Sequence, residues 1–370
     1  MPATGKAAVF HGPGKPFELK EIPIPEVEPD GILIQVTLAN ICGSDLHFWR
    51  GDAPLALPDD GWIFGHEMTG RAAKLGAKVK TDSLGQPLKD GDRVAYCYFY
   101  PCGRCYACLN KQPAACPNKI GRPLGPSQFP HFHGAFAEYY YLRPGGYVFK
   151  VPDDLPDELV SSVNCALSQV IYGLHAAGLR FGDSLLIQGA GGLGIQATAV
   201  AKEMGARIIV VDQLAPRLDL ARQFGADHTI NLKEIPDRRE RVKRVRDLTG
   251  GRGADVACDF VGFPQVIPEG LDMLRFGGTY LEIGTISRGA KVELEPATLI
   301  WGSKTIVGVV MYDPWVIPRA LEFLSRNKSR FPFEKLLSHK FRLEKIDEAF
   351  QASEWLNRDA TSITRAALIP

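Results

Sequence analysis

The sequence predicts an α/β protein in which a β-rich region is followed by a doubly wound parallel sheet. Residues 1–150 hold short β-type runs separated by many Pro and Gly residues, and helix-period patterns are scarce there. From residue 156 onward, apolar strands alternate with helical segments of about 10–15 residues. A Gly-rich turn at residues 189–194 joins one such strand to one such helix. This alternation is typical of a parallel sheet covered by helices on both faces.

The N-terminal region contains four predicted strands. They are Ala7–Phe10, Gly31–Leu38, Arg93–Tyr96 and Phe136–Tyr141. Each is rich in β-branched, aromatic or other apolar residues, and turn residues lie between them. We therefore expect an irregular β domain over residues 1–158, with a cysteine-rich lobe at about residues 97–118.

The second region begins with a predicted long helix, Leu159–Ala177, and a buried strand, Ser184–Gln188. The Gly-rich turn then opens a helix that runs to Met204. The alternation continues with strands at Arg207–Asp212, Asp227–Ile230, Ala254–Phe260 and Thr279–Ile283, and with helices at Pro216–Phe224, Ile235–Leu248 and Gln265–Phe276. Thr305–Met311 is predicted as a sixth strand. We expect this domain over residues 159–305, and a mixed C-terminal part over residues 306–370.

Length and charge exclude several classes of protein. The chain has 370 residues, which is enough for two or three domains that each bury a core. The 43 Lys and Arg residues nearly balance the 42 Asp and Glu residues, giving a net charge of +1. Such a balance argues against a protein that binds nucleic acid by neutralising phosphates.

The sequence also predicts a cytoplasmic protein without membrane spans. The N-terminus lacks the pattern of a secretory signal. The two long uncharged windows, Val160–Leu179 and Ser184–Ala201, contain polar side chains and glycines that a bilayer would leave unsatisfied. Eight cysteines in a reducing compartment favour metal binding over disulfides where their spacing is close.

The Gly-rich turn fits the dinucleotide-binding pattern G-x-G-x-x-G. Its residues are Gly189, Ala190, Gly191, Gly192, Leu193 and Gly194. The first glycine makes the tight turn, the second lets the backbone approach a pyrophosphate, and the last lets the helix pack on the strand. The helix N-terminus then attracts the anionic pyrophosphate. The alternative is a Gly-rich turn in another kind of α/β protein, but the strand before the turn and the helix after it favour a dinucleotide.

An acidic residue at the end of the next strand predicts which dinucleotide binds. Asp212 follows Gly194 by 18 residues, where a carboxylate would accept hydrogen bonds from the adenosine ribose and repel a 2′-phosphate. The sequence therefore predicts NAD rather than NADP. Arg217 lies five residues further on and qualifies this preference, because it could contact the ribose side. The alternative for Arg217 is a solvated helix residue, and the sequence does not decide between the two.

Four closely spaced cysteines predict a structural zinc site. Cys102, Cys105, Cys108 and Cys116 form the pattern C-x2-C-x2-C-x7-C. Four thiolates on so short a loop can close a tetrahedral site with no open position. A nucleic-acid-binding zinc ribbon is the alternative, but no basic or aromatic-rich segment accompanies the loop.

A second set of metal-binding residue types is dispersed along the chain. It comprises Cys42 and His47 within one short motif, then His66 and Glu67, and finally Cys165. Taken singly, each has an ordinary explanation: a core thiol, a hydrogen-bonded histidine or a residue on a buried helix face. Beside a nicotinamide-binding fold, two cysteines and one histidine with an open fourth position indicate a catalytic zinc site.

These motifs, in their order and spacing, resemble the zinc-dependent medium-chain alcohol dehydrogenases over essentially the whole chain. The matching segments are Cys42–His47, Gly65–Glu67, the four-cysteine lobe, Gly134–Tyr139, Cys165–Ser168 and Gly189–Gly194. The resemblance implies a GroES-like catalytic domain, made of the N-terminal part and the C-terminal tail, and a Rossmann domain between them. It further implies two zinc ions (Zn2+) per subunit, NAD, and a homodimer or homotetramer.

The resemblance also implies individual roles. Cys42, His66 and Cys165 would bind the catalytic zinc, with Glu67 able to approach the metal during ligand exchange. Asp45 would orient the His66 imidazole. Ser44 would hydrogen-bond the substrate hydroxyl, and His47 would complete a proton path through the nicotinamide ribose. One departure is Gly43, which stands where many relatives place a basic residue against the pyrophosphate.

The reaction implied is reversible hydride transfer between NAD and a primary or secondary alcohol, giving an aldehyde or ketone. Two other functions remain open at this point. A zinc-independent quinone or enone reductase of the same fold would lack the Cys42, His66 and Cys165 set. A non-catalytic protein that binds zinc and a nucleotide would not need Ser44 and His47. The sequence identifies a small-molecule substrate only by class.

Overall fold

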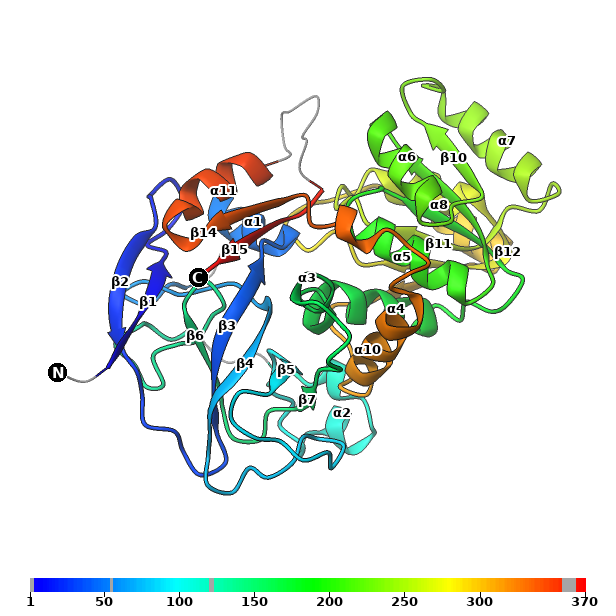
Figure 1. Ribbon diagram of the computed structural model, residues 1–370. Helices are drawn as coiled ribbons and strands as arrows, with labels where there is room; N and C mark the ends of the chain where they lie inside the picture. The colour runs from blue at the N-terminus through cyan, green and yellow to red at the C-terminus, as the bar shows by residue number, and fades with distance from the viewer. Residues whose placement is uncertain (1–2, 54–55, 120–122, 355–363) are drawn as a thin grey trace. The chain divides into compact units, whose positions relative to one another are not determined.

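The computed structural model describes residues 3–53, 56–119, 123–354 and 364–370 (Figure 1). The chain forms two compact units. The first contains residues 1–168, 313–328 and 333–370, and the second contains residues 169–312 and 329–332. No helix among the described residues has the length and apolar character needed to cross a membrane.

The first unit is built on a mixed sheet that brings the two ends of the chain together. Its strands run in the order β14 (His339–Arg342), β15 (Ala366–Ile369), β3 (Ile32–Asn40), β4 (Glu67–Leu75), β5 (Arg93–Tyr96) and β7 (Val148–Lys150). A further strand, β6 (Tyr139–Leu142), pairs with β3. Strands β1 (Thr4–Val9) and β2 (Glu18–Pro23) form a separate antiparallel pair. In Figure 1 the red β15 lies beside the blue β3, and the register pairs Ala367 with Asn40.

Alternation along these strands buries one large core. Ile34, Met68, Val94 and Leu368 lie in it with Phe64, Phe136 and Phe350, whose rings meet at edge-to-face angles. The predicted strand Phe136–Tyr141 begins later than expected, at Tyr139. The reason is that Phe136 donates its backbone N–H to Phe64 and Ala137 bridges to Ala7, so both residues pair with other segments.

The second unit is a six-stranded parallel sheet with the order expected of a Rossmann fold. The strands run β10 (His228–Asn231), β9 (Arg207–Asp212), β8 (Ser184–Gln188), β11 (Ala254–Asp259), β12 (Leu274–Glu282) and β13 (Thr305–Gly308). By position along the chain this order is 3-2-1-4-5-6. The predicted fold class, a β-rich domain of the GroES-like type with a Rossmann parallel sheet, is confirmed.

Helices connect the strands of this sheet (Figure 1). They are α5 (Gly192–Glu203), α6 (Ala215–Gln223), α7 (Arg238–Leu248), α8 (Val266–Met273) and α9 (Pro296–Gly302). Two predicted elements end early. The helix predicted to reach Phe276 stops at Met273, because Leu274 is extended and pairs with Ala254. The strand predicted to reach Met311 stops at Gly308, and Met311 itself has a φ of 130°.

The predicted long helix Leu159–Ala177 is divided into three pieces. They are α3 (Asp157–Val160), a π-helical turn (Val163–Leu167) and α4 (Ser168–Ala176). In the wide turn the backbone N–H of Leu167 donates to the carbonyl of Ser162, five residues earlier. Such turns are frequent at functional sites, and this one carries Cys165.

Other helices of the first unit are α1 (Gly43–Arg50), α2 (Tyr106–Leu109), α10 (Val316–Asn327) and α11 (Ile346–Ser353). Of these, α1 and α2 begin directly after a cysteine, Cys42 and Cys105 respectively. Both cysteines belong to the predicted metal sites. The helix starts therefore place thiols where unpaired backbone N–H groups can stabilise a thiolate.

Candidate functional site

The structure brings Cys42, His66 and Cys165 together within the first unit. Their ligand atoms all lie within 4.8 Å of one another. Cys42 caps the N-terminus of α1, His66 directly precedes β4, and Cys165 lies on the π-helical turn. Both thiols are buried.

Asp45 holds two of these residues in place. Its Oδ2 accepts the backbone N–H of Cys42 at 2.9 Å, and its Oδ1 lies 3.4 Å from Nδ1 of His66. Since Nδ1 faces Asp45, Nε2 is the atom left to bind a metal. Within the described chain, the buried Oδ1 has no hydrogen-bond partner, so a metal-bound imidazole that donates its Nδ1–H would satisfy it.

The donor set fits zinc. The Cys165 thiol hydrogen-bonds to the Cys42 sulfur, which lowers the pKa of Cys42 and raises the pKa of Cys165. Burial lowers the pKa of His66, but Asp45 and Cys42 raise it well above its usual value. Two sulfurs and one imidazole nitrogen leave a tetrahedral ion with one open position, as in catalytic zinc sites.

Ser44 lies at this centre, and His47 lies on the same helix. Ser44 Oγ is 3.5 Å from Nε2 of His66. The buried His47 has its Nδ1 3.0 Å from Oδ1 of Asp52 and 3.2 Å from a guanidinium nitrogen of Arg50. Sequence reasoning missed Asp52 and Arg50. Their closeness to His47 could have been a signal, because a carboxylate five residues after a predicted proton carrier can accept its proton.

Glu67 lies outside the group of convergent donors. Its carboxylate pairs with Arg365, with Nη2 at 2.8 Å from Oε2, and also accepts the Asn40 side-chain amide at 2.8 Å. All three side chains are buried. Burial raises the pKa of Glu67 to about 7, while the Arg365 charge opposes that rise. Arg365 and Asn40 were not predicted, and no local motif marks them, since Arg365 is 298 residues from Glu67 along the chain.

One aromatic ring lies against a donor residue. The Tyr98 ring lies 4.7 Å from the His66 ring, measured between centroids. Burial raises the pKa of Tyr98 well above its usual value, which keeps the phenol neutral. The rings of Phe48 and Trp62, by contrast, pack on each other and on Phe64 in the core.

The four cysteines of the lobe also converge. Their sulfurs all lie within 4.8 Å, and the Cys116 sulfur is 3.6 Å from that of Cys102 and 3.7 Å from that of Cys105. A tetrahedral ion with zinc–sulfur bonds of about 2.3 Å requires sulfur–sulfur distances of about 3.8 Å. Backbone N–H groups of Arg104 and Cys105, with the Asn118 amide, lower the pKa of Cys102 to about 6. The lobe is thus shaped for a closed four-thiolate site, with Cys108 as the fourth donor.

The fingerprint turn of the second unit has the expected local geometry. Gly189 has a φ of 95°, and a Cβ on Gly194 would lie 1.9 Å from the Gly189 carbonyl oxygen, so neither position tolerates a side chain. Gly191 is the N-cap of α5, and a Cβ there would meet nothing within 4 Å. Gly192 and Leu193 form the first turn of α5. The open space at Gly191 fits a pyrophosphate at the helix N-terminus.

Asp212 ends β9 beside this turn. Its Oδ2 accepts the backbone N–H of Ala190 at 2.7 Å, and its Oδ1 accepts that of Leu214 at 2.8 Å. Each carboxylate oxygen keeps a second lone pair for a ribose hydroxyl. Arg217 lies in the first turn of α6, five residues after Asp212, and is half-buried.

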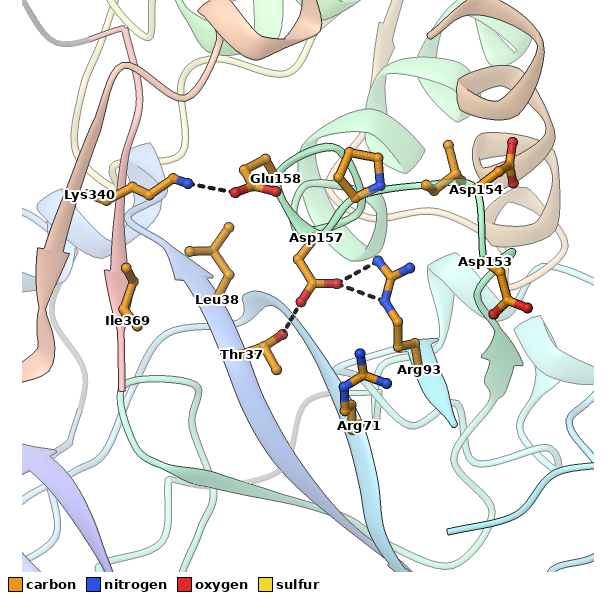
Figure 2. Close-up of a pocket in the computed structure, with 12 residues that line it drawn as sticks. Thr37, Leu38, Arg71, Arg93, Asp153, Asp154, Asp157, Glu158, Lys340 and Ile369 are labelled. Carbon is orange, nitrogen blue, oxygen red and sulfur yellow. Dashed lines mark hydrogen bonds and ion pairs between the residues drawn. The ribbon is translucent and has the colours of Figure 1, made fainter. Parts of the chain in front are cut away.

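A separate pocket of about 640 Å³ opens in the first unit and contains none of the predicted site residues (Figure 2). Four of its charged side chains form two ion pairs. Asp157, in the first turn of α3, accepts Thr37 Oγ1 at 2.7 Å and Arg93 Nε at 2.9 Å, and Lys340 pairs with Glu158 at 2.5 Å. These contacts tie α3 to β3, β5 and β14.

Comparisons with known proteins agree with this geometry. The family model for zinc-binding dehydrogenases matches residues 192–326, and that for the GroES-like domain of alcohol dehydrogenases matches residues 28–153. The chain is 33% identical to 5-exo-hydroxycamphor dehydrogenase of Pseudomonas putida, with 93% of each chain covered. It is 31% identical to sorbitol dehydrogenase of Bacillus subtilis, with 95% of this chain and 94% of the relative covered.

Solved structures show the same likeness. An alcohol dehydrogenase from Thermotoga maritima superposes with a TM-score of 0.91 at 30% identity, and all of both chains is covered. Benzyl alcohol dehydrogenase from Acinetobacter calcoaceticus superposes with a TM-score of 0.84 at 28% identity over 99% of each chain.

Proposed function

The chain belongs to the zinc-dependent medium-chain dehydrogenase/reductase family, and from that premise we propose that it is an NAD-dependent zinc alcohol dehydrogenase. Membership makes it an oxidoreductase. The proposal adds the reaction, which is reversible oxidation of a primary or secondary alcohol to an aldehyde or ketone. The observation that carries it is the convergence of Cys42, His66 and Cys165, with Ser44 3.5 Å from the imidazole.

The residues divide the chemistry among them. Zinc, when bound by the three donors, would polarise the substrate oxygen and lower the pKa of the alcohol hydroxyl. Asp45 keeps the His66 ring oriented. Ser44 would accept a hydrogen bond from the substrate hydroxyl and, as it takes that proton, give its own proton on. His47 can take a proton onward, because an imidazole nitrogen can accept and donate a proton and Nδ1 of His47 contacts Asp52.

The second unit supplies the cofactor site. The α5 N-terminus would bind the pyrophosphate, and Asp212 would accept the adenosine ribose hydroxyls. A bound NAD would supply the hydride acceptor for the hydrogen on the carbinol carbon. The charge on Asp212 would disfavour a 2′-phosphate, which supports NAD over NADP.

The same reasoning extends to the metal content, location and assembly of the protein. We propose two zinc ions per chain, one at each cysteine-containing centre. All eight cysteines are free thiols in the structure, which supports a cytoplasmic location. An exposed apolar edge of the second unit supports a homodimer or homotetramer.

A combined metal and activity experiment tests the function. Freshly purified protein should contain about two zinc ions per chain and should reduce NAD when supplied with members of a panel of polyols, cyclic alcohols and aromatic alcohols. Cys42→Ser should lose one zinc and the activity. A wild-type protein that holds a single zinc, or that oxidises none of the alcohols with either NAD or NADP, would contradict the proposal.

A further inference from the structure

Asn164 joins the segment that carries His66 to the segment that carries Cys165. It is fully buried on the π-helical turn, directly before Cys165. Its Nδ2 donates to the backbone carbonyl of His66 at 2.8 Å, and its Oδ1 accepts the backbone N–H of Met68 at 3.2 Å. One carboxamide therefore bonds to the donor residue His66 and to Met68 on β4.

This contact shortens the path between two donors that are far apart in sequence. His66 and Cys165 are separated by 99 residues along the chain. Through Asn164, they are separated by one hydrogen bond and one peptide unit. A short polar link of this kind restricts how far the Cys165 sulfur can move relative to the imidazole.

The hydrogen bonds inside the π-helical turn do not link it to β4. Within the turn, Leu167 donates its N–H to Ser162, and the Ser168 hydroxyl donates to Val163 at 2.5 Å. Both bonds lie inside the same segment. They shape the turn but do not set its distance from β4, whereas the Asn164 bonds do.

We propose that Asn164 is a positioning residue for the three-donor site, holding Cys165 at the separation from His66 that retains zinc. The proposal rests on the proposed function, because it takes these donors to bind zinc. Partners that hold ligand residues in place affect metal affinity by about 10- to 100-fold when they are removed. Asn164 is not itself a ligand. Its substitution should therefore weaken zinc retention although Cys42, His66 and Cys165 are all still present.

Two substitutions separate positioning from packing. Asn164→Ala removes both hydrogen bonds and leaves a cavity. Asn164→Leu removes the same bonds but fills nearly the same volume, so it restores packing without the link to His66. If Asn164 only fills space, the Leu variant should behave like the wild type, and it also provides folded protein if the Ala variant is too unstable.

A matched control is available in the same unit. Asn327 is also a buried asparagine, and its Nδ2 donates to the Phe323 carbonyl at 3.0 Å at the end of α10. Asn327→Ala should therefore cost stability without changing the geometry of the metal donors. The four-cysteine site serves as an internal reference within every variant.

The experiment measures zinc release to a chromogenic chelator, together with the melting temperature. Wild-type protein should release two zinc ions in two phases, which Cys42→Ser and Cys105→Ser assign to their sites. Both Asn164 variants should release the zinc of the three-donor site about 10- to 100-fold faster, with the four-cysteine phase and the Asn327→Ala variant unchanged.

Each other outcome has a definite meaning. Two wild-type phases with an unchanged three-donor phase in Asn164→Leu would overturn the inference while leaving the proposed function intact. Equal acceleration of both phases, or the same acceleration in Asn327→Ala, would show general destabilisation and would also overturn it. A wild-type protein that releases only one zinc ion per chain would contradict the proposed function itself.

Discussion

At the scale of single residues, the site depends on polar side chains that contact the donors without being donors. Asp45 faces the imidazole of His66, and Arg365 with Asn40 encloses the Glu67 carboxylate. Removing one partner of such a buried network leaves a desolvated polar group without compensation. The structure therefore places Glu67, the first residue of β4, in a buried network. Its partners are Asn40 at the end of β3 and Arg365 directly before β15.

The first prediction concerns proton transfer by His47. His47→Gln should slow alcohol oxidation near neutral pH by about 10-fold or more, because an amide cannot carry the proton. The Gln amide can still donate to Asp52, so the local structure should persist. The loss should shrink as the pH rises, since hydroxide or buffer base then accepts the proton. Steady-state rates across a pH series measure this.

Ser44→Ala provides the comparison for that prediction. It removes the hydroxyl next to the His66 imidazole, so base in solution should restore little of its activity. A His47→Gln loss that is independent of pH and confined to the KM for NAD would instead mean that His47 only packs against the cofactor.

The second prediction concerns the choice of cofactor. Asp212→Asn removes the negative charge, while its carbonyl oxygen can still accept one of the two backbone N–H groups. Losing a charged hydrogen-bond acceptor costs about 1.5–3 kcal/mol, so kcat/KM for NAD should fall about 10- to 100-fold. NADP should be used better than by the wild type, because its 2′-phosphate is no longer repelled.

Adding Arg217→Gln tests the role of the nearby cation. If Arg217 contacts the ribose side, the double variant should lose part of the gain with NADP. Wild-type protein that already prefers NADP would show that Asp212 does not lie beside the ribose.

At the scale of secondary-structure elements, the segment from α3 to α4 positions Cys165. Asp157 fixes its start to β3 and β5, and the π-helical turn carries the cysteine. The side chains of Arg93 and Asp157 are only 12% and 27% exposed, whereas those of Lys340 and Glu158 are 41% and 39% exposed. The two ion pairs in the pocket of Figure 2 should therefore differ in energy.

The third prediction compares these two pairs. Asp157→Ala should lower the free energy of unfolding by about 2–3 kcal/mol, because Thr37 and the largely buried Arg93 lose their acceptor. Glu158→Gln should change it by less than about 1 kcal/mol, since an exposed pair contributes little. Urea denaturation of both variants measures the difference. Equal effects would mean that the anchoring of α3 does not depend on Asp157.

At the scale of the whole molecule, the second unit has an apolar edge that its own fold does not cover. Strand β13 is the last strand of the six-stranded sheet. Beside it in sequence, Ile300 and Trp301 on α9 are 76% and 81% exposed, and Val310 is 58% exposed. Unpaired strand edges that are also apolar associate readily, and association with a second copy of the chain would cover this one.

The fourth prediction follows from that edge. Wild-type protein should be a dimer or tetramer by light scattering, and Trp301→Lys should shift it toward smaller species because burying a charge at the contact is costly. Phe181→Lys is the matched control, since Phe181 is 88% exposed elsewhere in the second unit. A monomeric wild type at working concentrations would refute the assembly.

Much of the second unit could be predicted from the sequence because its signals are local. Ser184–Gln188 and Arg207–Asp212 match the observed strands residue for residue, since each is an uninterrupted apolar run between turn residues. The π-helical turn could not be predicted. Its residues have ordinary helical character, and the interruption lies where Asn164 bonds to His66 and to Met68 on β4.

The residues of the candidate site also fall into two groups, those predictable from local sequence and those set by tertiary contacts. The sequence by itself determined the donor types, because close cysteine spacing in the lobe and the motifs around Cys42 and His66 are local patterns that zinc chemistry requires. Only the tertiary structure decided which distant groups brace them. Arg365 reaches Glu67 because β15 pairs with β3, and Asn164 reaches His66 because the segment after α3 packs on β4. Such partners are set by strand pairing and packing, which cannot be predicted from the spacing of residues along the sequence.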